Sequence, residues 1–320
     1  MPSSVPPTTH APAPALNRNG LVLGTSAYLL WGLLPLYFPL LAPAGPVEII
    51  AHRVVWSLAF CLLVLAVTGA LGTLRAVVRS PRTMVVLAGA GVLIATNWLV
   101  YVHGVLTGHT VDAALGYYIN PLVTVVLAVV ALGERLRRAQ WLAVGLGGAA
   151  VVVITAGVGR LPWIALALAG SFGAYGLLKN RVGRTVGALT SLTVETAAMT
   201  PLALAYLWWL GTTGILSFTA EGPAHMAALA ALGVVTAVPL LLFGGAARRL
   251  PLSVVGLLQY LAPTLQFLVA LLVFGEEMPA ARWAGFGLVW VALVILTADG
   301  LHAGRMLARA RLAEQSPRPA

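Results

Sequence analysis

Charged side chains are scarce in this sequence. They make up 9% of the 320 residues, whereas a soluble domain carries about 25%. With 9 acidic and 19 basic residues, a soluble fold of this length could not cover its surface, and 60% of the residues are apolar. The mean hydropathy is +0.94. These values exclude an ordinary soluble enzyme and a disordered chain, and they indicate a polytopic membrane protein.

The residues that build metal, cofactor and nucleophile sites are also few. Cys61 is the only cysteine, which excludes an intrachain disulfide and a cysteine metal cluster. The six histidines lie in different segments, and the chain holds neither an H-E-x-x-H nor a G-x-S-x-G motif. It has no Walker A motif, so ATP does not drive it directly. We therefore expect no enzyme activity, no metal and no cofactor.

Long apolar runs dominate what remains. A membrane-spanning helix needs about 20 apolar residues, and ten windows are free of acidic and basic residues, except for Glu195 in the seventh. The windows are 19–47, 54–74, 83–111, 113–133, 139–159, 161–178, 185–220, 222–247, 250–275 and 283–298. The sequence predicts an all-α protein with ten transmembrane helices and short connections.

The distribution of basic residues predicts the orientation. Ten spans place both termini on one side of the membrane. With the N-terminus in the cytoplasm, only Arg53, Arg160 and Arg282 fall on the outer side, and the other 16 of the 19 lysines and arginines fall inside. This split accounts for the net charge of +10 without a nucleic-acid partner. We expect a multi-pass membrane protein with both termini in the cytoplasm and the lipid bilayer as its surroundings.

The sequence predicts a cytoplasmic tail at each end of the chain. Residues 1–19 are rich in proline, serine and threonine and predict a disordered cytoplasmic tail. Residues 300–320 form a basic cytoplasmic tail. This second tail either lies on the inner leaflet as a basic helix or is solvated.

An internal repeat divides the remainder of the chain. A shift of 142 residues aligns Tyr118, Pro121, Gly133, Glu134 and Trp141 with Tyr260, Pro263, Gly275, Glu276 and Trp283. We therefore predict a first five-helix repeat at 20–158 and a second at 159–299. Five is an odd number, so the two copies have opposite orientations in the membrane. Inverted repeats of this kind are typical of transporters that work by alternating access.

Several stretches carry a family resemblance. The sequence resembles the RarD-type branch of the EamA (drug/metabolite transporter) family at 31–38 (WGLLPLYF), 48–56 (EIIAHRVVW), 115–122 (LGYYINPL), 133–136 (GERL), 161–163 (LPW), 239–243 (PLLLF), 247–252 (ARRLPL) and 258–263 (LQYLAP). The resemblance runs from about residue 20 to residue 299. It implies ten helices, a central cavity and movement of a small-molecule substrate across the inner membrane.

Three ionisable residues are candidates for substrate binding or coupling. Glu195 lies within a span, where a carboxylate must face a cavity or a partner. Its alternatives are a proton or substrate-cation site and a structural ion pair. Arg53 could act as an outer gate, contact a substrate carboxylate or anchor its helix at the interface, and an Arg53–Glu195 pair is conceivable. Asp112 is a second proton candidate.

Two prolines mark a second set of candidates. Pro121 and Pro263 are repeat mates, and each removes a backbone hydrogen bond within a span, which predicts paired helix kinks. Polar side chains near these kinks would line the cavity or bind helices together. The candidates near the kinks are Tyr117 and Asn120 on one helix and Gln259 and Gln266 on the other. In the third span, Asn97 and Tyr101 share a face and could hydrogen-bond to a ligand and stack on it, whereas Tyr101 taken alone fits an interfacial aromatic belt.

Two glycine–glutamate pairs are predicted to be structural. Gly133 and Gly275 suit helix C-termini, and Glu134 and Glu276 can cap the next helix. Small residues in the fifth and tenth spans could form a homodimer face.

Together these observations predict a secondary transporter for a small metabolite or drug-like molecule. Proton coupling and ion-free exchange both stay open. The alternative is a membrane-embedded sensor or scaffold that does not transport.

Overall fold

The computed structural model describes residues 17–133, 135–182 and 186–315. Every regular element in these ranges is a helix. The longer helices are α1 (Arg18–Leu33), α2 (Pro46–Val67), α4 (Pro81–Leu106), α5 (Thr110–Leu132), α6 (Arg138–Val158), α7 (Trp163–Val182), α8 (Ala188–Thr213), α10 (Pro223–Ala247), α12 (Leu261–Leu272) and α13 (Ala280–Gln315). The short elements are η1 (Leu34–Leu36), η2 (Phe38–Leu41), α3 (Leu71–Val78), α9 (Ser217–Ala220) and α11 (Leu252–Leu258).

Nine segments of the described chain are long and apolar enough to cross a membrane. Eight of them are single helices with or without a short extension, and the ninth, Val254–Leu272, joins α11 to α12. Helix α7 has 20 residues but is not among the nine. Its last turn carries Lys179 and Asn180, which lower its hydropathy. The ten expected windows therefore correspond to nine apolar spans and one more polar helix of similar length.

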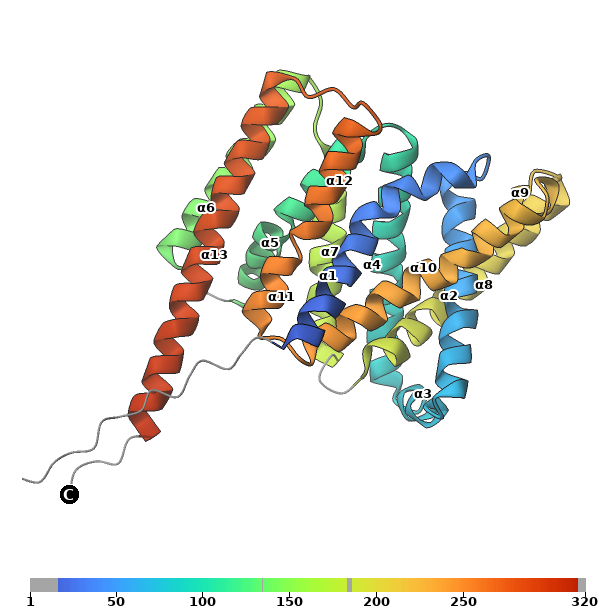
Figure 1. The fold of residues 1–320 in the computed structure, drawn as a ribbon, viewed down its shortest axis with the longest axis horizontal. Coiled ribbons are helices and arrows are strands. Elements are labelled where there is room, and N and C mark those ends of the chain that lie inside the picture. The colour runs from blue at the N-terminus through green and yellow to red at the C-terminus, as the bar shows by residue number, and fades with distance from the viewer. Residues whose placement is uncertain (1–16, 134, 183–185, 316–320) are drawn as a thin grey trace, which may run out of the picture.

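The contacts between helices come in equivalent pairs: a contact made by a first-half helix with the second half has a counterpart made by the corresponding second-half helix with the first half. Helix α1 packs on α10 and α12, and α7 packs on α4 and α5. Three further pairs, α2 with α8, α5 with α12 and α6 with α13, join a helix of the first half to the helix at the same position in the second. The α6–α13 pair forms one edge of the bundle (Figure 1).

The two ends of the bundle differ in charge. The end that holds α3, the last turn of α5 and the start of α6 carries most of the arginines of the described chain, and we call it the basic end (Figure 1). The opposite end, which holds the α6–α7 and α12–α13 connections, we call the far end. The far end carries Arg160 and Arg282.

The two proline positions have different surroundings. Helix α5 runs without interruption through Pro121, and the pair of kinks stays a prediction. Its counterpart is divided into α11 and α12 at Gln259 and Tyr260. Pro263 is the third residue of α12. A missing backbone N–H is harmless there, because the first four N–H groups of a helix have no partner within the helix.

The last helix is longer than its span. Helix α13 has 36 residues and continues to Gln315, so the chain does not change structure at residue 300, where we placed the start of a tail. An ion pair of 2.7 Å between Arg137 and Asp299 fixes this helix to the start of α6. The first expected tail, 1–19, lies outside the described residues up to residue 16, and α1 begins at Arg18.

Glycines allow the closest helix contacts. A Cβ atom at Gly233 of α10 would collide with the carbonyl of Trp56 on α2, and one at Gly91 of α4 would lie 2.7 Å from the carbonyl oxygen of Glu195 on α8. Other glycines face open space, including Gly145 and Gly148 of α6. These two glycines lie on α6, at the edge of the bundle, where a second copy of the chain could pack. The homodimer face stays a prediction.

The substitution Gly233→Ala tests the α2–α10 contact. The added methyl group must displace backbone, so we expect it to lower the free energy of unfolding by about 1–3 kcal/mol. The matched change Gly148→Ala adds a methyl group in open space and should leave stability equal or slightly higher. Thermal unfolding of both variants in detergent measures the difference. Equal melting temperatures would contradict the close contact.

Candidate functional site

Glu195 lies in a polar cluster between α7 and α8. Its side chain is 1% exposed and forms an ion pair with Lys179 at 2.7 Å. The hydroxyl groups of Ser191 and Tyr175 donate to the same carboxylate at 2.7 and 3.2 Å. Lys179 also donates to Ser191. The carboxylate is therefore fully partnered within the chain, and we call these four residues the Glu195 cluster.

Local sequence spacing builds this cluster. Ser191 and Glu195 are four residues apart on α8, and Tyr175 and Lys179 are four residues apart on α7, so each pair shares a helix face. Glu195 is the eighth residue of α8, about 10 Å from its basic end at about 1.5 Å per residue. The apolar window that contains Glu195 starts at residue 185, whereas α8 begins at Ala188. The sequence therefore placed Glu195 deeper in its helix than the structure does.

Lys179 was missed by the sequence reasoning. It is the only lysine of the chain, against 18 arginines. It was counted with the basic residues that set orientation, because it lies at the edge of an apolar window. Its identity was the available signal: a lysine in an arginine-only background marks a position where the shape of the ammonium group matters.

Arg53 lies in a second cluster, between α2, α4 and α10. It is 4% exposed. Its Nε donates to the hydroxyl of Thr236 at 2.9 Å, and its guanidinium carbon lies 4.1 Å from the ring centroid of Trp98. No acidic side chain among the described residues is within ion-pair distance of it. The conceivable Arg53–Glu195 pair does not form, because Glu195 pairs with Lys179.

Three of the residues predicted to contact substrate, Asn97, Tyr101 and Tyr117, lie around this second cluster. Tyr101 packs edge-on against Tyr117, with ring centroids 5.5 Å apart. The Tyr117 hydroxyl donates to the Asn97 side-chain oxygen at 3.0 Å, and the Asn97 amide donates to the Leu168 carbonyl and the Ser171 hydroxyl. Asn97 therefore has a structural role between α4, α5 and α7. The Tyr101 hydroxyl is buried and has no partner among the described residues.

The expected amides of α5 and α12 are partly unsatisfied. Gln266 donates to the Trp31 carbonyl at 3.2 Å, whereas its side-chain oxygen has no partner among the described residues. The Asn120 side-chain oxygen is likewise buried without a partner in this part of the chain. Gln259 is half-buried at the break between α11 and α12. Two buried acceptors are thus available for a bound donor.

Asp112 lies at the far end, in a structural ion cluster. Arg160 and Arg282 approach its two carboxylate oxygens at 3.5 and 3.4 Å. These contacts connect the start of α5 to the α6–α7 connection and the start of α13. Asp112 is 5% exposed, and both of its carboxylate oxygens face guanidinium groups.

The glycine–glutamate turn of the second half positions a helix cap. Gly275 is left-handed with φ +65°, and so is its counterpart Gly133 with φ +69°. The Glu276 carboxylate accepts from the backbone N–H groups of Thr110 and Val111 at 2.6 and 2.9 Å. It therefore caps α5, in the other half of the chain, rather than the next helix. Glu134 lies outside the described residues.

A further buried polar group lies where α2 meets α9 and α10. The Glu48 carboxylate accepts from the backbone N–H and the hydroxyl of Ser217 at 2.9 and 2.8 Å. The same hydroxyl lies 2.9 Å from His225 Nε2. The sequence does not reveal this contact, because Ser217 lies 169 residues from Glu48.

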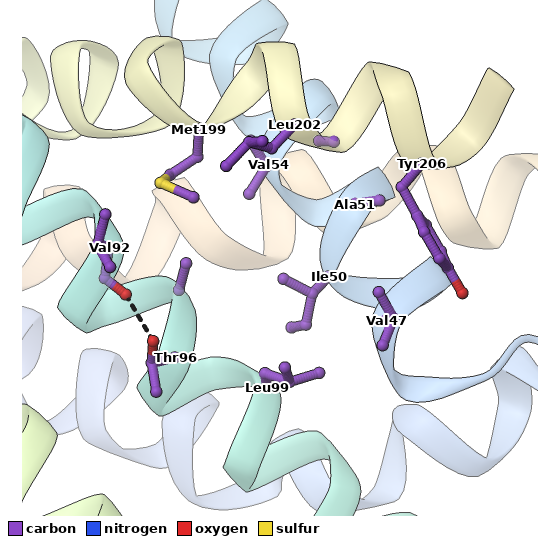
Figure 2. Close-up of a pocket in the computed structure, with 12 residues that line it drawn as sticks. Val47, Ile50, Ala51, Val54, Val92, Thr96, Leu99, Met199, Leu202 and Tyr206 are labelled. Carbon is purple, nitrogen blue, oxygen red and sulfur yellow. Dashed lines mark hydrogen bonds between the residues drawn. The ribbon is translucent and has the colours of Figure 1, made fainter. Parts of the chain in front are cut away.

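An apolar cavity of about 230 Å³ lies between α2, α4 and α8. Figure 2 shows that Ile50 and Val54 of α2, Leu99 of α4 and Met199 of α8 surround it. The Thr96 hydroxyl at its wall donates to the Val92 carbonyl. Neither Arg53 nor Glu195 lines this cavity. The polar clusters are therefore separate from it.

Comparisons with known proteins identify the family of this chain. The profile of the EamA-like transporter family matches residues 18–156. "Protein RarD" of Streptomyces exfoliatus is 52% identical over 94% of both chains. The chain belongs to the RarD-type branch of the EamA family. An "Uncharacterized transporter" of Vibrio cholerae is 42% identical and covers 92% of this chain and 97% of its own.

Other relatives extend the comparison. "Chloramphenicol-sensitive protein RarD" of Pseudomonas aeruginosa is 31% identical and covers 92% of this chain and 98% of its own. A crystal structure matches with a TM-score of 0.55 at 21% identity, over 86% of this chain and 96% of the other, which shows a shared fold. The protein is thus a multi-pass membrane transporter of the drug/metabolite family.

The substitution Glu276→Ala tests the cap on α5. It removes two charge-assisted hydrogen bonds from a helix N-terminus, so we expect the free energy of unfolding to fall by about 1–2 kcal/mol. The neighbouring change Glu277→Ala, at an exposed side chain, is the control and should have little effect. Thermal unfolding in detergent compares them, and equal stability would rule out the cap.

Proposed function

We propose that the protein is a secondary transporter that moves a small metabolite or drug-like molecule across the bacterial inner membrane by alternating access. In this proposal α7 is the tenth membrane helix, and residues 20–158 and 159–299 form two inverted five-helix repeats. The basic end faces the cytoplasm, as do both termini. The exchange-symmetric packing of the helices and the distribution of the arginines support this arrangement.

The positions of the two polar clusters fit an inverted repeat. Arg53 is the eighth residue of α2, and Glu195 is the eighth residue of α8. Helix α2 starts at the far end and α8 starts at the basic end, so each charge lies about 10 Å from an opposite end of the bundle. A substrate site between them would be near the middle of the membrane.

The buried Glu195–Lys179 pair is the observation that carries the proposal. It joins α7 to α8 near the basic end. Buried ion pairs contribute little net stability, whereas removing the charge of one partner is costly. A proton on Glu195 would end its attraction to Lys179 and allow α7 and α8 to separate at the cytoplasmic side. Proton uptake would in this way open the transporter inward.

The unsatisfied groups supply the substrate contacts of this proposal. The Tyr101 hydroxyl and the side-chain oxygens of Asn120 and Gln266 are buried without partners among the described residues. Unpaired buried polar groups are costly, and a bound substrate would satisfy them in part of the transport cycle. Gln259, at the helix break, is a further candidate because backbone groups there are not fully paired within a helix.

Uptake into proteoliposomes tests the proposal. A pooled set of metabolites and drugs would be offered with and without a pH gradient to wild type, to Glu195→Gln and to the control Glu221→Gln, whose side chain is exposed. We expect gradient-driven uptake by wild type and by the control. Glu195→Gln should reduce it to the level of protein-free vesicles, because the amide cannot exchange a proton.

Two outcomes would contradict parts of the proposal. Gradient-driven uptake that persists in Glu195→Gln would make the ion pair purely structural. Binding of a compound by folded wild-type protein that never transports it would support the alternative, a membrane-embedded sensor or scaffold.

A further inference from the structure

We propose that Arg53, Trp98 and Tyr101 form the binding site for the carboxylate of an amphipathic substrate with an aromatic body. This inference rests on the proposed function, because it assigns a substrate class to the transporter. It is carried by an uncompensated buried cation, by an unpartnered buried hydroxyl and by a row of aromatic rings.

The charge of Arg53 has no counter-ion in the described chain. An arginine stays protonated even when it is buried. The Nε group of Arg53 is bound by Thr236, and the four N–H bonds of the two Nη groups make no hydrogen bond to a described residue. A buried charge without a partner is costly. A membrane protein keeps such a charge where a ligand of opposite charge supplies the partner.

The acidic residues that could neutralise Arg53 are engaged elsewhere. Glu48 accepts from Ser217, Asp112 lies between Arg160 and Arg282, and Glu195 pairs with Lys179. Each of these carboxylates therefore satisfies a different part of the structure. Within the part of the chain that the structure describes, no carboxylate is left for Arg53, so its anion would come from a bound substrate.

Tyr101 offers a second donor to the same anion. It lies three residues after Trp98 on α4, so the two side chains share a face of the helix. Tyr101 is 2% exposed, and its buried hydroxyl has no partner among the described residues. A carboxylate has two oxygens and can accept from a guanidinium and a hydroxyl together.

Aromatic rings continue from this point across the bundle. Phe38 contacts Tyr101, Tyr101 contacts Tyr117, Tyr117 contacts Phe172, and Phe172 contacts Tyr175, with centroid separations of 5.9, 5.5, 6.0 and 5.9 Å. Tyr175 donates to Glu195. This row connects the two polar clusters, and its rings would pack on an aromatic substrate body along the route. An amphipathic aromatic acid matches both features.

Binding of three probes of similar size tests the inference. The probes are 3-phenylpropanoate, 3-phenylpropan-1-ol and 3-phenylpropylamine, titrated calorimetrically into purified full-length protein in detergent. We expect wild type to bind the carboxylate about 10-fold or more tightly than the alcohol or the amine. Arg53→Gln should weaken binding of the carboxylate by about 10- to 100-fold.

Tyr101→Phe provides a second variant in case Arg53→Gln does not fold. It removes a hydroxyl that has no partner in the described chain, so the fold should be as stable as wild type. Binding of the carboxylate should fall about 3- to 10-fold. The controls are Arg160→Gln, an arginine at the far end, and Tyr118→Phe, whose hydroxyl bonds to Thr264. Both should bind as wild type.

Three results would overturn the inference. They are failure of wild type to bind 3-phenylpropanoate, equal affinity for the three probes, and unchanged affinity in folded Arg53→Gln or Tyr101→Phe. Detergent binding does not require transport, so the two proposals can fail separately. Selective binding without uptake into proteoliposomes contradicts the transporter and leaves the carboxylate site in place. Uptake of neutral compounds that is independent of Arg53 contradicts the site alone.

Discussion

The hydrocarbon core of a membrane supplies no hydrogen bonds, so each polar group inside it needs a partner from the chain or from a ligand. Helices satisfy most of the backbone, and specific side chains satisfy what helices leave open. Glu276 accepts from the first N–H groups of α5, and Glu48 accepts from the backbone N–H and the hydroxyl of Ser217. Asp112 is held by two arginines. These contacts join the two halves of the chain near the far end.

The same constraint distinguishes the groups that remain. Glu195 is paired only through Lys179 and its hydroxyl neighbours, and Arg53 is bound by one hydroxyl and one aromatic ring among the described residues. A transport cycle needs interactions that can be exchanged at low cost. In our account the Glu195 pair opens when a proton binds, and Arg53 gains its partner when a substrate binds. The row of aromatic rings lies between the two clusters at which these events take place.

The sequence predicted what depends on local composition. Apolar windows located the spans, and Glu195 was noticeable because carboxylates are rare inside them. The sequence did not predict which side chains of other helices pair with these residues. Lys179 lies 16 residues from Glu195, and Thr110 lies 166 residues from Glu276. Pro121 and Pro263 align in the repeat, yet only the second lies near a helix start, because the position at which a helix begins depends on its tertiary surroundings.

The central claim is that the Glu195–Lys179 pair serves coupling rather than stability. The double variant Lys179→Met/Glu195→Met replaces the pair with apolar side chains of similar length. Replacing a buried ion pair in this way is often neutral or stabilising. We predict that the double variant melts at or above the wild-type temperature and that its uptake no longer responds to a pH gradient. Wild-type uptake driven by the gradient, in a folded double variant, would contradict the account.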